Sequence, residues 1–258
     1  MIAGTRSRID SGPRLVSLVP SVTESLRHWG IDPVACTRFC EQPDLVQVGG
    51  TKNPDVAAIL ELAPDLVVVD AEENRVEDHD ALVTAGLDVH VLDVVSVAGA
   101  VGQMSELADR LGLTWSPSDL PVRPQGSGPS VFVPIWRRPW MTVNGLTYGS
   151  DLLRWLGASN VMASHPDRYP AVTIEEVAAL EPDLVLAPTE PYVFSDRHLD
   201  ELAAVAPVEV VDGRDLFWWG VRTPAALARL ATQLDWATSG RHGPSDQRRH
   251  RHPHRDDG

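Results

Sequence analysis

The sequence predicts an α/β protein of two similar parallel-sheet lobes, joined by a single long helix, with a ligand cleft between the lobes. Three observations predict this architecture. The phrase Leu-Ala-Pro-Asp-Leu-Val-Val at 62–68 recurs as Leu-Glu-Pro-Asp-Leu-Val-Leu at 180–186, short apolar runs alternate with helical patterns, and an amphipathic stretch at 96–113 precedes a proline-rich segment. Alternating strands and helices are typical of parallel βαβ units, and the repeat indicates that the unit occurs twice.

Composition excludes several classes of protein. The chain has 258 residues, 43% hydrophobic and 22% charged, as in soluble globular proteins with a proper core. Its net charge of −14 has the wrong sign for sequence-independent nucleic-acid binding. No apolar run approaches the roughly 18 residues of a membrane span. Cys36 and Cys40 would lie about 13 Å apart in extended chain, which favours two unpaired thiols over a disulfide or a metal site.

The first lobe is expected over residues 14–95. An apolar strand at 15–20 leads into a helix that runs to about Gly30, and Ser21 and Glu24 have the spacing of a capping box at its start. Asn53 is expected to cap a second helix, with Pro54 at its first position. A buried strand at 66–69 follows.

The second lobe is expected over residues 130–236, with the same order of elements. A strand at 131–134 is followed, after a longer loop, by a helix at 151–157. Thr173 and Glu176 form a second capping-box pattern before the strand at 184–187. Thr223 is expected to cap the last helix, with Pro224 in its first turn.

Residues 96–129 are expected to connect the lobes. Apolar residues follow a helical rhythm from Val97 to Leu111, and an 18-residue helix would span roughly 27 Å. Prolines and glycines from Pro117 to Pro129 then predict a loose connector. Because parallel sheets bind ligands beyond the carboxyl ends of their strands, both lobes are expected to turn those ends toward the cleft.

The two ends of the chain are expected to lie outside the lobes. Residues 1–13 form an N-terminal extension without the apolar core of a signal peptide, which predicts a cytoplasmic protein as the chain is written, or an extracytoplasmic one if an upstream signal sequence was missed. Residues 237–258 are rich in histidine and arginine and are expected to form a disordered tail. Loose metal binding by its histidines is the alternative.

Aromatic residues gather in the loops that follow the predicted strands. Trp140, Trp218 and Trp219 lie in loops with proline and arginine, where core packing does not demand large rings. Aromatic faces with a few polar groups form pockets for large flat ligands, so a ligand site is predicted, with core packing as the alternative. The wider set of loop aromatics also includes Phe39, Trp136, Tyr169, Tyr192, Phe194 and Phe217.

Motifs for catalysis are missing from the sequence. It contains no Gly-x-Ser-x-Gly elbow, no Gly-x-Gly-x-x-Gly turn, no Walker loop, and no His-Glu-x-x-His or Cys-x-x-Cys pattern. We therefore expect a binding protein with no catalytic residues, no metal centre and no covalently bound cofactor. A cytoplasmic protein or enzyme that handles a cofactor or metal is the alternative from another class.

The sequence resembles the helical-backbone (class III) substrate-binding proteins of ABC importers, whose ligands are vitamin B12, ferric siderophores and haem. The resemblance rests on Arg-Leu-Val-Ser-Leu-Val-Pro-Ser-Val-Thr-Glu at 14–24, Thr-Arg-Phe-Cys at 37–40, Val-Gly-Gly-Thr-Lys-Asn-Pro at 48–54, the two Pro-Asp-Leu-Val phrases and Glu-Pro-Tyr-Val-Phe at 190–194. It is nearest to the cobalamin-binding branch, and it implies two α/β lobes on one long helix. A ferric siderophore or haem is the alternative ligand.

The resemblance also implies site residues and partners. Phe39, Trp140, Tyr169 and Trp218 match positions that surround the corrinoid, with Trp219 and Arg222 beside them; Trp136 and Tyr192 complete the candidate set. The resemblance implies a monomer that docks on an ABC permease through acidic residues on the outer surface of each lobe. Glu72 and Glu190 occupy equivalent places in the repeat and are the candidates, with ordinary solvated acids as the alternative.

Overall fold

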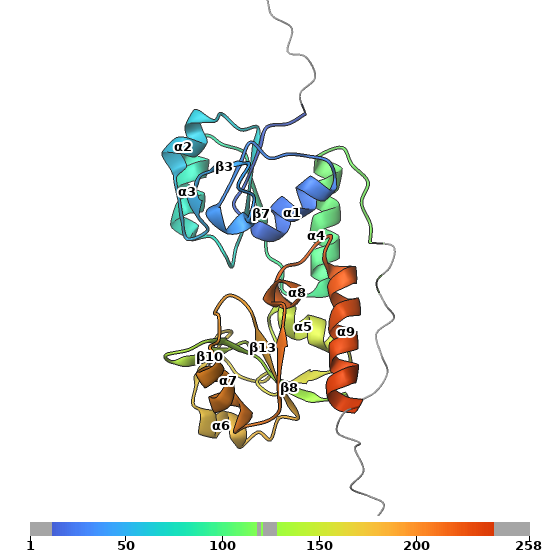
Figure 1. Cartoon of the computed structure of the whole chain (residues 1–258). Coiled ribbons are helices and arrows are strands. Elements are labelled where there is room, and N and C mark those ends of the chain that lie inside the picture. Colours follow the sequence, from blue (N-terminus) through green and yellow to red (C-terminus); the bar gives the residue numbers. More distant parts are fainter. Residues whose placement is uncertain (1–11, 118–119, 121–127, 240–258) are drawn as a thin grey trace, which may run out of the picture.

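The computed structural model describes residues 12–117, 120 and 128–239, with side chains up to residue 234. Most of the predicted N-terminal extension, part of the proline-rich connector and residues 240–258 of the predicted tail lie outside the described residues. The chain forms two lobes that lie one above the other in Figure 1. In the described part, no helix is both long enough and apolar enough to cross a bilayer.

The N-terminal lobe is built on a five-stranded sheet with the strand order β3-β2-β1-β6-β7, in which every pair is parallel. Its strands are β1 (Leu15–Ser17), β2 (Ala35–Cys36), β3 (Val46–Gln47), β6 (Leu66–Asp70) and β7 (Val89–Leu92). A short antiparallel pair, β4 (Gly49–Gly50) and β5 (Asn53–Pro54), lies beside it. The helical segments are α1 (Pro20–His28), the 3-10 turn η1 (Arg38–Cys40), α2 (Val56–Glu61) and α3 (Val76–Thr84).

The C-terminal lobe has a four-stranded parallel sheet in the order β11-β8-β13-β14. Its strands are β8 (Ser130–Phe132), β11 (Ser159–Asn160), β13 (Leu184–Pro188) and β14 (Val208–Val211). A three-stranded antiparallel sheet, which the sequence did not predict, is formed by β9 (Pro134–Trp136), β10 (Trp140–Thr142) and β12 (Ala171–Val172). The helices are α5 (Tyr148–Trp155), α6 (Ile174–Ala178), α7 (Asp196–Ala203), α8 (Gly213–Phe217) and α9 (Thr223–Ser239).

The repeat in the sequence is a repeat in the structure. Strand β6 begins at Leu66 and β13 at Leu184, and each is preceded by a short helix, α2 or α6, at the same spacing. The predicted α/β class with two parallel sheets is therefore confirmed.

Alternate strand residues point to opposite faces of each sheet, as strand geometry requires. In β1, Leu15 belongs to a core that both lobes share, whereas Val16 belongs to a separate core under α2 and α3. In β13, Leu184 joins the shared core and Val185 a third core under α6 and α7. The shared core runs through α1, α4, α5 and α9, so that apolar packing is continuous between the lobes.

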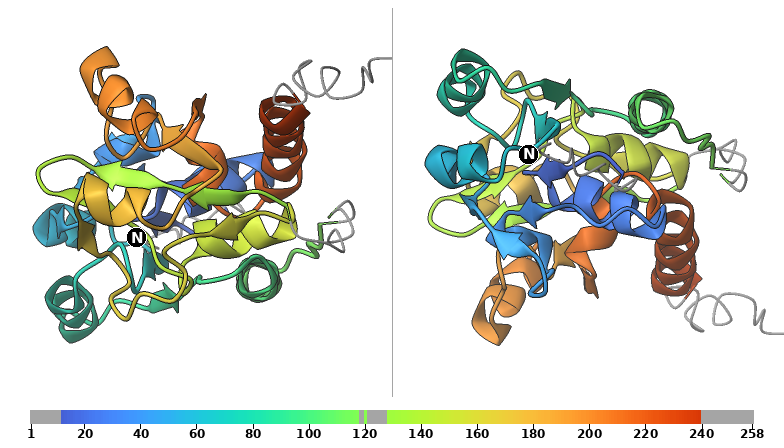
Figure 2. Two further views of the ribbon diagram at one scale, coloured as in Figure 1. Left: turned by 90° about the horizontal axis from the view of Figure 1, so that it is seen from below. Right: turned by 90° about the horizontal axis from the view of Figure 1, so that it is seen from above.

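The connecting helix is shorter than the sequence pattern predicts. Helix α4 (Val97–Arg110) has 14 residues, about 21 Å of rise, and Ser96 caps it through a hydrogen bond from the Gly99 amide. Its first amide, that of Val97, donates to Asp151 of α5 in the other lobe. The helix therefore begins at the junction of the lobes and runs beside the N-terminal lobe, on the same side of the molecule as α9 (Figures 1 and 2).

Three of the four predicted helix caps are wrong, and one is confirmed. Thr223 is the first residue of α9 rather than the cap before it, and its hydroxyl bonds that of Tyr148. Asn53 lies in β5, and Asp55 caps α2 instead, accepting from the Ala58 amide at 3.0 Å. Helix α1 has no side-chain cap. The capping box of Thr173 and Glu176 is present at α6.

The expected capping-box residues of α1 hold the lobes together. The Ser21 hydroxyl accepts from the amide of Trp219 at 3.2 Å, and the Glu24 carboxylate takes the guanidinium of Arg222. Ser25 accepts from the amide of Val221 at 3.3 Å. Side chains that would have satisfied α1's own amides are used for contacts across the junction.

Candidate functional site

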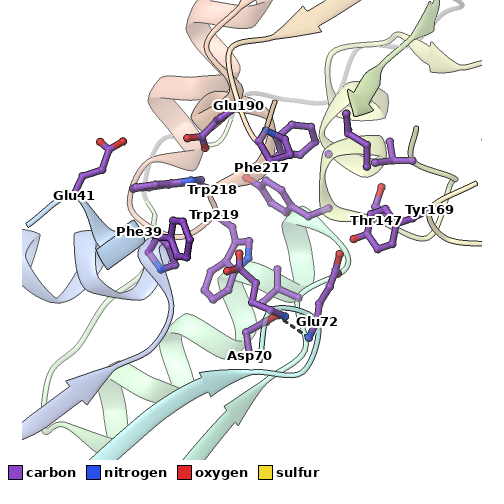
Figure 3. Close-up of a pocket in the computed structure, with 18 of the residues that line it drawn as sticks. Phe39, Glu41, Asp70, Glu72, Thr147, Tyr169, Glu190, Phe217, Trp218 and Trp219 are labelled. Atoms are coloured by element: carbon purple, nitrogen blue, oxygen red, sulfur yellow. Dashed lines mark hydrogen bonds between the residues drawn. The ribbon is translucent and has the colours of Figure 1, made fainter. Parts of the chain in front are cut away.

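A cavity of about 470 Å³ lies between the lobes, beyond the carboxyl ends of both parallel sheets (Figure 3). Phe39 and Glu41 follow β2, Asp70 ends β6, and Pro191 follows β13. This is the place at which open parallel sheets bind ligands, and the volume falls in the range of small-molecule sites. The lining residues are Pro20, Arg38, Phe39, Glu41, Asp70, Glu72, Glu73, Val94, Ile135, Val143, Thr147, Tyr148, Gly149, Tyr169, Glu190, Pro191, Phe217, Trp218 and Trp219.

Aromatic rings from both lobes form the walls of the cavity. Phe39, which is 49% exposed, comes from the N-terminal lobe, and Tyr169, Phe217 and Trp218 come from the C-terminal lobe. Figure 3 shows Phe39 and Trp218 near one end of the cavity and Tyr169 near the other. Partly exposed rings at a junction leave apolar area that a flat ligand would cover.

Carboxylates from both lobes line the same cavity. Asp70 is only 3% exposed, and its Oδ1 accepts from the amides of Glu72 at 2.9 Å and Glu73 at 3.1 Å. Its Oδ2 is buried and has no hydrogen-bond partner among the described residues. A buried carboxylate oxygen without a partner is uncommon, because its desolvation is not compensated.

Burial makes these acids harder to ionise. Desolvation raises the pKa of Asp70, Glu72 and Glu190 above their ordinary values. It raises the pKa of Glu73 to about 7, with the neighbouring Asp70 carboxylate adding to the effect. Near neutral pH the cavity therefore gains negative charge as pH rises.

Two ion pairs join the lobes beside the cavity. Arg168 lies 3.5 Å from the Glu72 carboxylate, and Arg214 lies 3.0 Å from that of Glu41. Each pair takes its acid from the N-terminal lobe and its arginine from the C-terminal lobe. Two of the five lining carboxylates are thus neutralised by the opposite lobe.

Four of the predicted ligand-binding residues line the cavity: Phe39, Tyr169, Trp218 and Trp219. Arg222 does not. Its guanidinium pairs with Glu24 and Asp215, and it lies 5.5 Å from the ring of Trp218, behind the cavity wall.

The expected position of Trp140 in the cleft is wrong. Trp140 is 5% exposed in the third core, its ring stacks on Phe194 at 5.8 Å, and the Arg137 guanidinium lies over it at 4.6 Å. Trp136 and Tyr192 also lie outside the lining and contact each other edge to face at 5.0 Å. Trp136 lies in β9 and Trp140 in β10, and these antiparallel strands direct both tryptophans away from the ends of the parallel strands.

Glu72 and Glu190 do not lie on the outer surfaces where docking residues were expected. Both line the inter-lobe cavity, from opposite lobes. The repeat predicts their equivalence, but the position after strands β6 and β13 is at the carboxyl edge of each sheet. Because the two residues are equivalent and that edge of each sheet faces the other lobe, both lie at the cleft.

Sequence reasoning missed Asp70, Glu73 and Tyr148 as lining residues, and it placed Phe217 among the loop aromatics without assigning it to the site. Asp70 and Glu73 could have been found from their place at the end of a buried strand, since that edge faces the cleft. Tyr148 gives no such signal, because it lies at the start of a helix whose beginning was predicted three residues later. Its hydroxyl bonds the Thr223 hydroxyl at 2.8 Å and is therefore already satisfied.

No group of three or more histidine, cysteine, aspartate or glutamate side chains in the described part of the chain is arranged to hold a metal ion. Cys36 and Cys40 are buried free thiols, and the Cys40 sulfur contacts the hydroxyls of Thr23 and Thr37 at 3.2 Å.

Replacing Glu73 with glutamine is expected to stabilise the ligand-free protein at alkaline pH. The pKa of Glu73 is about 7 in the folded state against an ordinary 4.5, so its stabilising contribution is present below pH 4.5 and is lost as pH rises through 7. At pH 8 this ionisation costs up to about 3 kcal/mol. The neighbours that set this value are Asp70, Glu72 and Cys40, which raise it, and Lys52, which lowers it.

Thermal melts between pH 5.5 and pH 8 measure this effect. The wild-type midpoint should fall across that range more steeply than that of Glu73→Gln. The exposed Glu77 provides a control, and Glu77→Gln should follow the wild type. Parallel curves for wild type and Glu73→Gln would show that Glu73 is already ionised at low pH.

Comparisons with known proteins agree with this geometry. No family model matches the sequence. The vitamin B12-binding protein of Salmonella choleraesuis (strain SC-B67) is 24% identical over 199 residues, covering 68% of this chain and 72% of that protein. The periplasmic vitamin B12-binding protein of Vibrio cholerae has a TM-score of 0.70 at 18% identity, covering 88% of this chain and 98% of that one.

A periplasmic heme-binding protein from Roseiflexus sp. RS-1, in its apo form, has a TM-score of 0.72 at 20% identity, covering 88% and 99% of the two chains. The chain has the fold of the helical-backbone substrate-binding proteins. The resemblance expected from the sequence is therefore confirmed. These three similar proteins are named for the ligands that they bind, and they are binding proteins rather than enzymes.

Proposed function

We propose that the chain is the substrate-binding protein of an ABC-type importer and that it holds a corrinoid such as cobalamin between its lobes, without catalysis. The observation that carries the proposal is the aromatic-walled cavity at the carboxyl ends of both sheets. Curated relatives named vitamin B12-binding protein support the ligand. A corrin ring presents a broad face for the rings of Trp218 and Tyr169 and projects amide groups toward polar walls.

Haem is the second candidate, because solved structures of this fold include heme-binding proteins. Haem carries two negatively charged propionates, and a site for haem would need arginine or lysine side chains to pair with them. Among the described residues, Arg38 is the only basic one in the lining, and the same lining holds five carboxylates. The charge of the cavity therefore favours the corrinoid over haem.

The proposed role places the protein outside the cytoplasmic membrane, where it would pass its ligand to a permease. Solved proteins of the same fold that are named periplasmic support this location. Sequencing the DNA upstream of Met1 and identifying neighbouring permease and ATPase genes would test it. A cytosolic location in cell fractionation would contradict it.

Calorimetric titration of the purified protein with cyanocobalamin and aquacobalamin, with haemin in parallel, tests the ligand. A corrinoid at one hundred times its Kd should stabilise the fold by about 2.7 kcal/mol, which raises the melting midpoint by about 5–10 °C in a chain of this size. Haemin should give a smaller shift. No heat and no shift with either corrinoid would overturn the proposal.

A further inference from the structure

We propose that the cavity selects a metal chelate with net positive charge, so that among otherwise matched chelates the cationic one binds most tightly. This inference deepens the proposed function and rests on it for the site, but its test separates the two. The inference is based on carboxylates without an ion-pair partner and on aromatic faces, both of which line the same cavity and attract cations.

The cavity keeps an excess of acidic groups after its ion pairs are counted. Of the five lining carboxylates, Glu41 and Glu72 pair with arginines of the opposite lobe. Asp70, Glu73 and Glu190 make no ion pair among the described residues. Glu73, with its pKa of about 7, is mostly protonated at pH 6.5, so Asp70 and Glu190 carry the unpaired charge there. Negative charge is therefore left in the cavity, and it comes from both lobes.

One oxygen of the Asp70 carboxylate receives no hydrogen bond from the described part of the protein. The residue is only 3% exposed, and its Oδ2 has no partner in the described part of the chain. Two amides hold the other oxygen and fix the group in place. A fixed, buried carboxylate beside the cavity is little screened by water, so it attracts a cation in the cavity more strongly than an exposed acid would.

The aromatic walls of the cavity add to this preference. Aromatic faces attract cations, and two guanidinium groups already use this attraction: Arg38 lies 4.8 Å from the ring of Phe39, and Arg222 lies 5.5 Å from that of Trp218. Arg38 is exposed, so water screens its charge more than the buried Asp70 is screened. Rings and acids together favour a flat cation over a flat anion.

Corrinoids supply matched ligands for the test. Cyanocobalamin is neutral, and replacing its axial cyanide by water gives aquacobalamin, which carries one positive charge at pH 6.5 with the same corrin and nucleotide. We expect the wild-type protein to bind aquacobalamin at least about tenfold more tightly than cyanocobalamin. The visible spectrum of bound aquacobalamin should keep its water-ligated form. A shifted spectrum would mean that a protein group bonds to cobalt, which contradicts selection by charge.

Two variants from opposite lobes connect this preference to the residues. Asp70→Asn and Glu190→Gln should each bring the affinity ratio of the two cobalamins closer to one, whereas the exposed Glu77→Gln should leave it unchanged. Melting curves confirm that each variant is folded. The wild-type ratio does not depend on the variants, so it decides the question even if Asp70→Asn unfolds.

A second pair of chelates separates this inference from the proposed function. A ferric trihydroxamate with a pendant ammonium group carries positive charge, and haemin with its propionates carries negative charge. If both cobalamins bind equally, the charge inference fails and the proposed function stands. If neither cobalamin binds but the cationic hydroxamate does and haemin does not, the proposed function fails and the inference stands. Preferential binding of haemin would overturn both.

Discussion

Replacing Trp218 with alanine is expected to weaken corrinoid binding about 30-fold or more while leaving the fold intact. The indole forms part of the cavity wall and is only partly buried without ligand, so its removal takes away contact area for the ligand more than it opens the core. Large rings in such sites contribute about 2 kcal/mol or more, which corresponds to that loss of affinity. Isothermal titration of both proteins with the same corrinoid measures the ratio.

Trp136 offers a matched control for this substitution. It is also a tryptophan of the C-terminal lobe, it is 45% exposed, and it lies outside the cavity lining. Trp136→Ala should change the affinity less than threefold. If Trp136→Ala abolishes binding and Trp218→Ala does not, the ligand lies on the outer aromatic cluster and the inter-lobe cavity is not its site.

Replacing Gly220 with alanine is expected to destabilise the protein by about 3 kcal/mol and to weaken binding as well. Gly220 has φ +95°, and a Cβ there would lie 2.5 Å from the Ser25 hydroxyl oxygen. That hydroxyl accepts a hydrogen bond from the amide of Val221, the residue after Gly220. The amide of Trp219, the residue before Gly220, donates to the Ser21 hydroxyl. Strain from the backbone therefore adds to a steric clash at the contact between the lobes.

Substitutions at Gly30 and Gly112 distinguish the cost of backbone strain from the cost of the steric clash. Both have positive φ, +79° and +74°, and neither Cβ would meet another atom within 4 Å. Gly30→Ala should cost only the backbone strain, about 1 kcal/mol. Chemical denaturation of the variants measures the difference. Equal losses for Gly30→Ala and Gly220→Ala would show that the contact with Ser25 contributes nothing.

The fold could be predicted because its signals are local and repeated. Apolar runs such as Leu66–Asp70 and Leu184–Pro188 are buried on both faces of their sheets, and caps and prolines mark the helices between them. The caps of α1 could not be predicted, because Ser21 and Glu24 are used by Trp219 and Arg222 from almost two hundred residues away. No local pattern carries that information.

The site could be predicted only in part, for a similar reason. Phe39 and Trp218 follow elements at the carboxyl edge of the sheets, so their place in the sequence is enough to predict that they lie at the cleft. Trp140 has the same loop-like surroundings in sequence, but an unpredicted antiparallel strand buries it against Phe194. Acids such as Asp70 were missed because a lone carboxylate in sequence is usually a solvated one.

A crystal structure of the protein with aquacobalamin tests most directly whether the ligand lies between the lobes. We expect the corrin ring in the inter-lobe cavity, with one face against Trp218 and Phe39 and the ring of Tyr169 in contact. The cobalt and its bound water should lie toward Asp70 rather than toward solvent. A corrinoid bound against Trp136 and Tyr192, or anywhere else outside the cavity, would contradict the proposed site.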